Sequence, residues 1–132
     1  MNEHHFLEMA IIMILSGMLS TMNIWAYKLT HIRFSLNDAY MISLMTGWML
    51  FFMGMYYGSM KYTFIGLVTI ILSISAIRNQ WFVSYDQYIR GMIPHHSMAL
   101  TMSKPHLNVP FAKTIYLNQL HEINDMTRKD VL

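Results

Sequence analysis

Two adjacent histidines follow a proline in the second half of the chain, within the segment Gly91-Met92-Ile93-Pro94-His95-His96-Ser97-Met98. Imidazole with thioether is a ligand set that suits copper, whereas imidazole with carboxylate suits iron or zinc. The chain has 15 methionines and no cysteine, so disulfides and thiolate sites are excluded. Most of these methionines are expected to be apolar filler in helices. Those beside the histidine pair are candidate metal ligands.

The histidine pair lies in a segment with helical periodicity, residues 85–103. Side chains recur there every three or four residues, at Tyr88, Met92, His95 or His96, Ala99 and Met102. Pro94 either begins this helix or kinks it, because proline has no N–H and clashes with the preceding turn. Successive helical residues differ by about 100°, so His95 and His96 must point to different sides. The spacing does not decide which of them faces the interior.

A second helical segment follows, from Phe111 to about Arg128. Its periodic positions are Ile115, Gln119, Glu122, Ile123 and Met126. The intervening loop, 104–110, contains two prolines, so the tail is predicted to fold as a helical hairpin. Gln119, Glu122 and Met126 line one stripe of the second helix. The hairpin is too small to build a large core alone, so we expect it to pack on a partner or on a second copy.

Three apolar runs precede the hairpin, at about 9–27, 39–60 and 63–83. The first two carry no formal charge, whereas the third is uncharged only as far as Ile77 and reaches its full length if Tyr62 and the segment 81–83 extend it. Each is long enough to cross a hydrocarbon core of about 30 Å. Within the second run, Gly54 and Gly58 form a GxxxG spacing, which permits close helix approach. The predicted fold is all-α, with a three-helix transmembrane region at 1–83 and a His- and Met-rich hairpin domain at 84–132.

The composition agrees with a membrane protein. Of the 132 residues, 55% are hydrophobic and 12% are charged, whereas soluble domains carry about 25% charged residues. The formal net charge of +2 is too small to indicate nucleic-acid binding. His4 and His5 form a second pair, but three spans place them across the membrane from the tail. They cannot join the same site, and we expect a solvated chain end there.

The tail resembles the domain-of-unknown-function family number 305. The similarity covers about the last 48 residues and is strongest at Asp86 and in the run 91–100, which contains the Met-Ile-Pro-His-His string. The second-helix pattern of that family matches at Ala112, Ile115, Gln119, Glu122, Ile123 and Met126. The three spans also look like a membrane-anchored branch of the family. The chain departs from the family pattern in one place. The second helix of the family often begins with an Asp-Pro pair, whereas this chain has Pro105-His106 nearby, so the residue at which the second helix begins stays open.

The resemblance implies a ferritin-like hairpin that dimerises into a four-helix bundle, and an association with copper or silver. Carried over by position, the implied ligands are His95, His96, Met92, Met98 and Met102, with Glu122 and Met126 as second candidates. It also implies a hairpin that faces the periplasm or the cell exterior. The few loop charges point the other way, because Lys28 and Arg33 lie on the side of the tail and Lys61 lies opposite. We expect an outward hairpin.

The sequence therefore predicts an integral membrane protein that captures or buffers Cu(I), although other transition metals stay open as alternatives. We expect the protein to lie in the lipid bilayer and to form a homo-oligomer. The alternative is a structural dimerisation module without bound metal. An oxidoreductase with a ferritin-like centre is less favoured, because Glu122 and Asp125 supply too few carboxylates. Phosphate loops, HExxH and GxSxG are all missing from the sequence, so we predict no enzyme.

Overall fold

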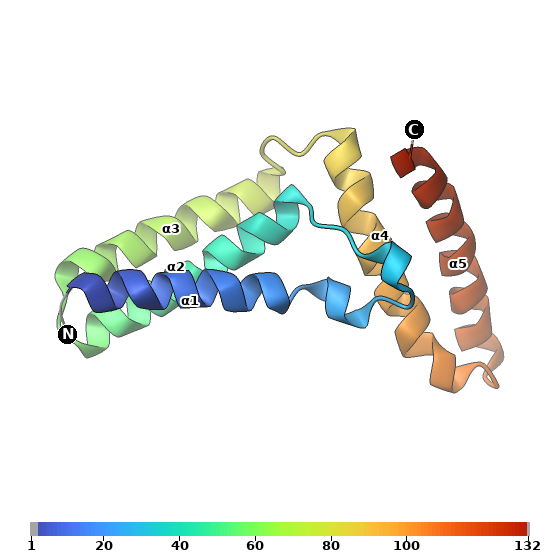
Figure 1. The fold of residues 1–132 in the computed structure, drawn as a ribbon, viewed down its shortest axis with the longest axis horizontal. Coiled ribbons are helices and arrows are strands. Elements are labelled where there is room, and N and C mark those ends of the chain that lie inside the picture. Colours follow the sequence, from blue (N-terminus) through green and yellow to red (C-terminus); the bar gives the residue numbers. More distant parts are fainter. Residues whose placement is uncertain (1–2, 132) are drawn as a thin grey trace. The chain divides into compact units, whose positions relative to one another are not determined.

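The computed structural model describes residues 3–131, with side chains as far as Arg128. This part of the chain is all-helical, as predicted, and forms two compact units (Figure 1). The first unit joins the chain up to Ser20 with Asn37–Phe82, and the second joins Thr21–Leu36 with Val83–Leu132. The chain changes units close to the predicted border at residue 83. The second unit, however, also contains 21–36, and so includes the last residues of the first predicted span, about 9–27.

The first unit contains three long apolar helices, α1 (Glu3–Leu19), α2 (Leu36–Tyr56) and α3 (Met60–Asn79). Each is long and apolar enough to cross a membrane, and for α1 the candidate span continues to Trp25. Large apolar side chains on all three helices are exposed, as expected for surfaces that face lipid. Helix α1 begins earlier than the predicted run because the first turn tolerates Glu3 and the two histidines, whereas hydropathy locates only the uncharged part.

Helices α2 and α3 approach closely at glycines. A Cβ atom on Gly66 would collide with the backbone of Phe51, and one on Gly54 would collide with the backbone of Thr63. A hydrogen bond of 3.0 Å from Ser73 to Ser43 joins the same two helices. The predicted GxxxG pair does not act as a unit, because Gly58 lies in the turn after α2, with a φ of +71° and open space around it. Small residues and a hydroxyl pair thus hold these helices together.

The second unit is built on α4 (Tyr85–Ser103) and α5 (Pro110–Val131), which lie side by side and are joined through the short 3-10 helix η3 (Lys104–His106) (Figure 1). The side-chain oxygen of Ser84 caps α4 by accepting a hydrogen bond from the backbone N–H of Gln87. Pro94 therefore lies inside the helix and does not begin it. The buried apolar side chains of this unit are Ile89, Ile93, Leu100 and Ile123.

Residues 21–36, named the strap here, fold onto α4 and contain the short 3-10 helices η1 (Met22–Trp25) and η2 (Leu29–His31). Side chains of α4 bind the strap along its length. Thr101 donates to the carbonyl of Trp25 at 2.6 Å, and Gln87 accepts from the backbone N–H of Leu36 at 2.8 Å. The strap supplies packing that the hairpin lacks on its own, which weakens the argument that the hairpin needs a partner.

Candidate functional site

His96 and Glu122 join the two helices of the hairpin. His96 is buried on α4, and its Nε2 lies 2.7 Å from Oε2 of Glu122 on α5. The other ring nitrogen, Nδ1, lies 3.0 Å from the carbonyl oxygen of Met92, one turn earlier. A carbonyl only accepts hydrogen bonds, so Nδ1 must carry the hydrogen. A backbone contact of this kind fixes the ring orientation and aims Nε2 as the reactive nitrogen.

The contact between Nε2 and Glu122 then requires a positive partner. With the hydrogen on Nδ1, a neutral ring presents a lone pair at Nε2, and an ionised carboxylate also presents only lone pairs. Two acceptors 2.7 Å apart repel each other. The pair is therefore satisfied by an extra proton, or by a cation that both groups bind. An imidazole nitrogen facing a carboxylate is a donor set that transition metals accept.

Charge at this site is not fully shielded from solvent. The side chain of His96 is 11% exposed, whereas that of Glu122 is 54% exposed. The carboxylate can therefore swing away from the imidazole at little cost, while the imidazole is held by its burial and by the carbonyl of Met92. The imidazole is therefore the fixed group of this pair, and the carboxylate is the mobile one.

The other predicted ligands occupy different environments. His95 is exposed, with its ring centroid 5.9 Å from that of His96, so the two rings lie on different sides of α4. The thioether side chains of Met92, Met98 and Met126 are half-buried, whereas Met102 is exposed. By helical spacing Met92 lies one turn from His96, and Met126 lies one turn from Glu122, so each shares the face of its partner.

The structure joins only two of the candidate groups directly. Across the described residues, no three His, Asp or Glu side chains gather closely enough to hold a metal ion. His121 is paired within α5, with Nε2 3.4 Å from Oδ2 of Asp125, and Asp125 also accepts from Arg128 at 2.7 Å. A metal site here depends on thioether sulfur or solvent for its remaining ligands.

A second polar network, absent from the sequence predictions, lies on the opposite face of α4. Ser97 is completely buried, and its Oγ accepts a hydrogen bond of 2.7 Å from the backbone N–H of Tyr27. Nδ1 of His31 lies 2.9 Å from the same oxygen. Burial lowers the pKa of His31, and the nearby charges of Lys28 and Arg33 lower it further. These surroundings favour the neutral form of the ring.

The spacing of polar residues on α4 is the sequence signal that could have revealed this network. Gln87, Arg90, Ser97 and Thr101 fall on one side of the helix, roughly opposite His96. Polar residues on two faces indicate that a second segment covers the helix. Tyr27 also reaches α5, where its hydroxyl accepts a hydrogen bond of 3.2 Å from Tyr116. This contact raises the pKa of Tyr116.

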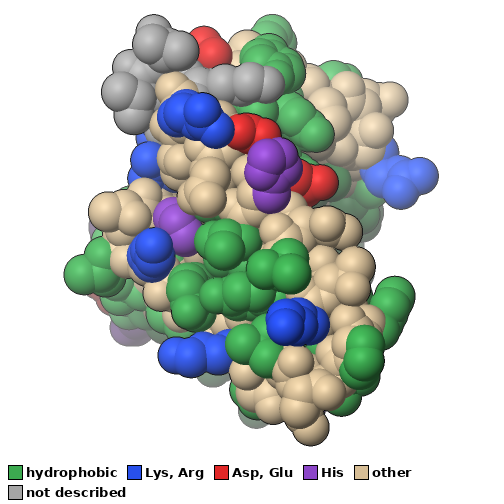
Figure 2. Space-filling model, turned by 90° about the vertical axis from the view of Figure 1, so that its right-hand side faces the viewer, with side chains coloured by type: hydrophobic (Ala, Val, Ile, Leu, Met, Phe, Trp, Pro, Cys, Tyr) green, Lys and Arg blue, Asp and Glu red, His purple; other side chains and the backbone are tan. Residues whose placement is uncertain are grey.

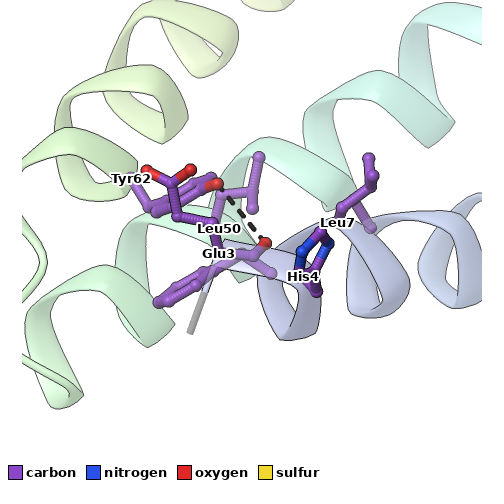
Figure 3. A pocket seen from close by; sticks show the side chains of 7 residues that line it. Glu3, His4, Leu7, Leu50 and Tyr62 are labelled. Atoms are coloured by element: carbon purple, nitrogen blue, oxygen red, sulfur yellow. Dashed lines mark hydrogen bonds between the residues drawn. The ribbon is translucent and has the colours of Figure 1, made fainter. Parts of the chain in front are cut away.

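The amino-terminal histidines belong to the first unit, and their surroundings differ from those of His96. His4 lines an open hollow of about 330 Å³ together with Phe6, Leu50 and Tyr62 (Figure 3). The neighbouring carboxylate of Glu3 pairs with Lys61 at 2.7 Å. The only acidic side chain in this lining is therefore engaged by a lysine, and the hollow is mainly apolar. These features do not favour a second metal site.

Comparisons with known proteins give one substantial similarity. The chain is 44% identical over 138 aligned positions to uncharacterized protein L153 of Acanthamoeba polyphaga mimivirus, in an alignment that covers 96% of this chain and 91% of that protein. No protein-family model matches the chain, and no solved structure is significantly similar to it.

Proposed function

This chain belongs to the family of uncharacterized protein L153 of Acanthamoeba polyphaga mimivirus, and from its own residues we propose that it is an integral membrane protein whose hairpin binds copper. The observation that carries the proposal is the contact between His96 and Glu122. One imidazole nitrogen is fixed by a carbonyl, and the other faces a carboxylate across the two helices. This arrangement presents a nitrogen lone pair and a carboxylate to one shared cation, which we propose to be a metal ion.

Copper is our choice of metal because of the thioethers around this pair. Met92 and Met126 flank the imidazole and the carboxylate on their own helices, and thioether sulfur favours Cu(I) over harder cations. The chain has no cysteine to compete for a soft metal. The resemblance to the domain-of-unknown-function family number 305 supports the same assignment. It also supports a ferritin-like hairpin that dimerises and faces the cell exterior, which we propose with it.

Binding and release at this site would be controlled by protons. A metal ion binds the lone pair of Nε2 and therefore competes with protons for this nitrogen, so acid favours release. Thioethers do not titrate, so sulfur ligands would retain Cu(I) at a lower pH than imidazole alone. A site with one fixed and one mobile ligand suits capture and transfer better than permanent storage.

The test is titration of the purified full-length protein with Cu(I) against a competing chelator. His96→Gln should lower the affinity at least tenfold, whereas the matched change His95→Gln, at an exposed ring, should leave it within about twofold. Met92→Leu with Met126→Leu should weaken Cu(I) binding but not Zn(II) binding. Equal affinity in the His96→Gln and parent proteins would overturn the proposal.

A structural role is the second candidate, and it rests on the same contact. Because His96 and Glu122 connect α4 to α5, they can stabilise the hairpin without any metal. In that case His96→Gln would lower the unfolding temperature and would not change the metal content. Elemental analysis of protein purified without chelator, alongside thermal unfolding, separates the two functions.

A further inference from the structure

The turn of the hairpin carries an exposed apolar surface that the proposed metal site does not use. We name this surface the tip and define it by Met102, Leu107, Val109, Phe111 and Ile115. The side chain of Phe111 is 75% exposed. The tip also borders an open hollow of about 400 Å³, which His106 and Ala112 help to line. Apolar side chains gathered on one exposed surface mark an interaction site.

Positive charge surrounds the tip. Between Asp86 and Glu122 the sequence contains no acidic residue, but Lys104 and Lys113 are present and both are exposed. Nζ of Lys104 lies 5.6 Å from the centroid of the Tyr27 ring. Figure 2 shows one face of the molecule, on which hydrophobic and basic side chains lie beside one another in the lower half and acidic side chains lie in the upper half. The partner of the tip must therefore offer both an apolar phase and negative charge.

A second copy of the chain fits this surface poorly. Two copies packed tip to tip about a two-fold axis would bring each patch against its own equivalent. Lys104 and Lys113 would then face lysines, with no carboxylate of the tip to neutralise them. The headgroup layer of an anionic bilayer supplies the missing charges, and its acyl region receives Phe111 and Val109.

The chain also keeps the tip within reach of a membrane. Thr101, close to the tip, is bound to the carbonyl of Trp25, where the candidate span of α1 ends. At the other end of α4, only residues 80–84 connect it to α3. The hairpin is thus joined by short lengths of chain to two helices that can span a bilayer, which keeps the local concentration of lipid high once they are inserted.

We propose that the tip of the hairpin docks on anionic lipid at the surface of the membrane in which the protein is embedded. Phe111 and its apolar neighbours enter the interfacial region, and Lys104 and Lys113 bind lipid phosphates. The proposal rests on membrane insertion of α1, α2 and α3, and it is independent of metal binding.

The absence of cysteine allows a clean test with a single label. An environment-sensitive fluorophore at Ser103→Cys, in the full-length protein, is placed in nanodiscs that contain brominated lipid. Discs of phosphatidylcholine mixed with phosphatidylserine should quench it at least twofold more than discs of phosphatidylcholine alone. The matched control, Asn124→Cys on the far half of α5, should show no such difference.

Variants distinguish the possible outcomes. Lys104→Gln with Lys113→Gln should abolish the effect of phosphatidylserine, and Phe111→Ser should reduce quenching in both lipids. Equal quenching with and without phosphatidylserine, or none in either, would overturn the proposal. Energy transfer between the labels of two copies of the chain, without quenching by lipid, would also overturn the proposal, because the tip would then contact protein and not lipid. Cu(I) affinity, measured on the same samples, reports separately on the metal site.

Discussion

At the scale of single residues, the strap places an imidazole where protonation is unfavourable. His31 is only 5% exposed and contacts the buried hydroxyl of Ser97. Its pKa is lowered first by burial and then by the positive charges of Lys28 and Arg33. The imidazole of His96, in contrast, faces a carboxylate. Two histidines near one helix therefore have different electrostatic surroundings, because only His96 has a negative partner.

Acid should release the strap. Since the pKa of His31 is lower in the folded state than its ordinary value of 6.5, the unfolded state binds more protons just below that pH. The stability of the second unit should therefore fall as the pH drops below about 6.5, by at most about 1.4 kcal/mol per pH unit, and level off below the lowered pKa. A fluorophore at Thr30→Cys, followed during denaturation between pH 5 and 8, measures this slope.

Two substitutions control this experiment. His31→Asn keeps a polar partner for Ser97 and removes the titrating group, so the slope should flatten. His106→Asn, at an exposed position, should leave the slope unchanged. An unaltered slope in His31→Asn would contradict the assignment of this pH dependence to His31.

At the scale of elements, the contact between α2 and α3 depends on the absence of side chains. Lipid is as apolar as the helix surfaces, so burial of apolar area contributes little to helix association in a membrane. Close approach of the backbones must supply the attraction instead, and Gly54 and Gly66 allow it. By the same reasoning, exchanging one large apolar residue for another on the outer faces of these helices should have little effect on their association.

Gly66→Ala should separate α2 from α3, because the added methyl group meets the backbone of Phe51, which cannot move aside as a flexible side chain can. We expect a loss of about 1–3 kcal/mol in the free energy of unfolding, measured by denaturation in mixed detergent micelles. Leu67→Ala, on the neighbouring exposed position, should cost much less. Similar losses in both variants would argue against a glycine-dependent contact.

At the scale of the whole molecule, the open question is the side of the membrane on which the hairpin lies. Positive charge in the strap favours the cytoplasm, whereas the family resemblance favours the exterior. Copper capture from outside the cell requires the second arrangement. Under the proposed three-span topology, the amino terminus and the turn between α2 and α3 would lie on the side away from the hairpin.

A single cysteine can decide this orientation. In intact cells, Ser103→Cys should react with a membrane-impermeant thiol reagent, and Met60→Cys, at the exposed start of α3, should react only after permeabilisation. The cysteine-free parent gives no background. The reverse pattern would place the hairpin in the cytoplasm and would redirect the copper proposal to intracellular buffering.

The sequence by itself determined the helices and their order. Periodicity and hydropathy are local properties, so they located α4 at the predicted residues 85–103 and the second and third apolar runs within three or four residues of α2 and α3. The first run, predicted at about 9–27, begins six residues after the start of α1 and ends eight residues after its end. Hydropathy could not place the helix ends, because capping and polar residues outside the apolar run decide them.

Only the tertiary structure decided which groups meet. The spacing left His95 and His96 equivalent, and the position of α5 made His96 the buried partner of Glu122. Polar residues on a second side of α4 indicate that some segment covers the helix, but they do not identify the strap, because His31 and Ser97 are distant along the chain and share no periodic pattern. Contacts of this kind depend on how whole elements pack, and no local preference of the chain encodes them.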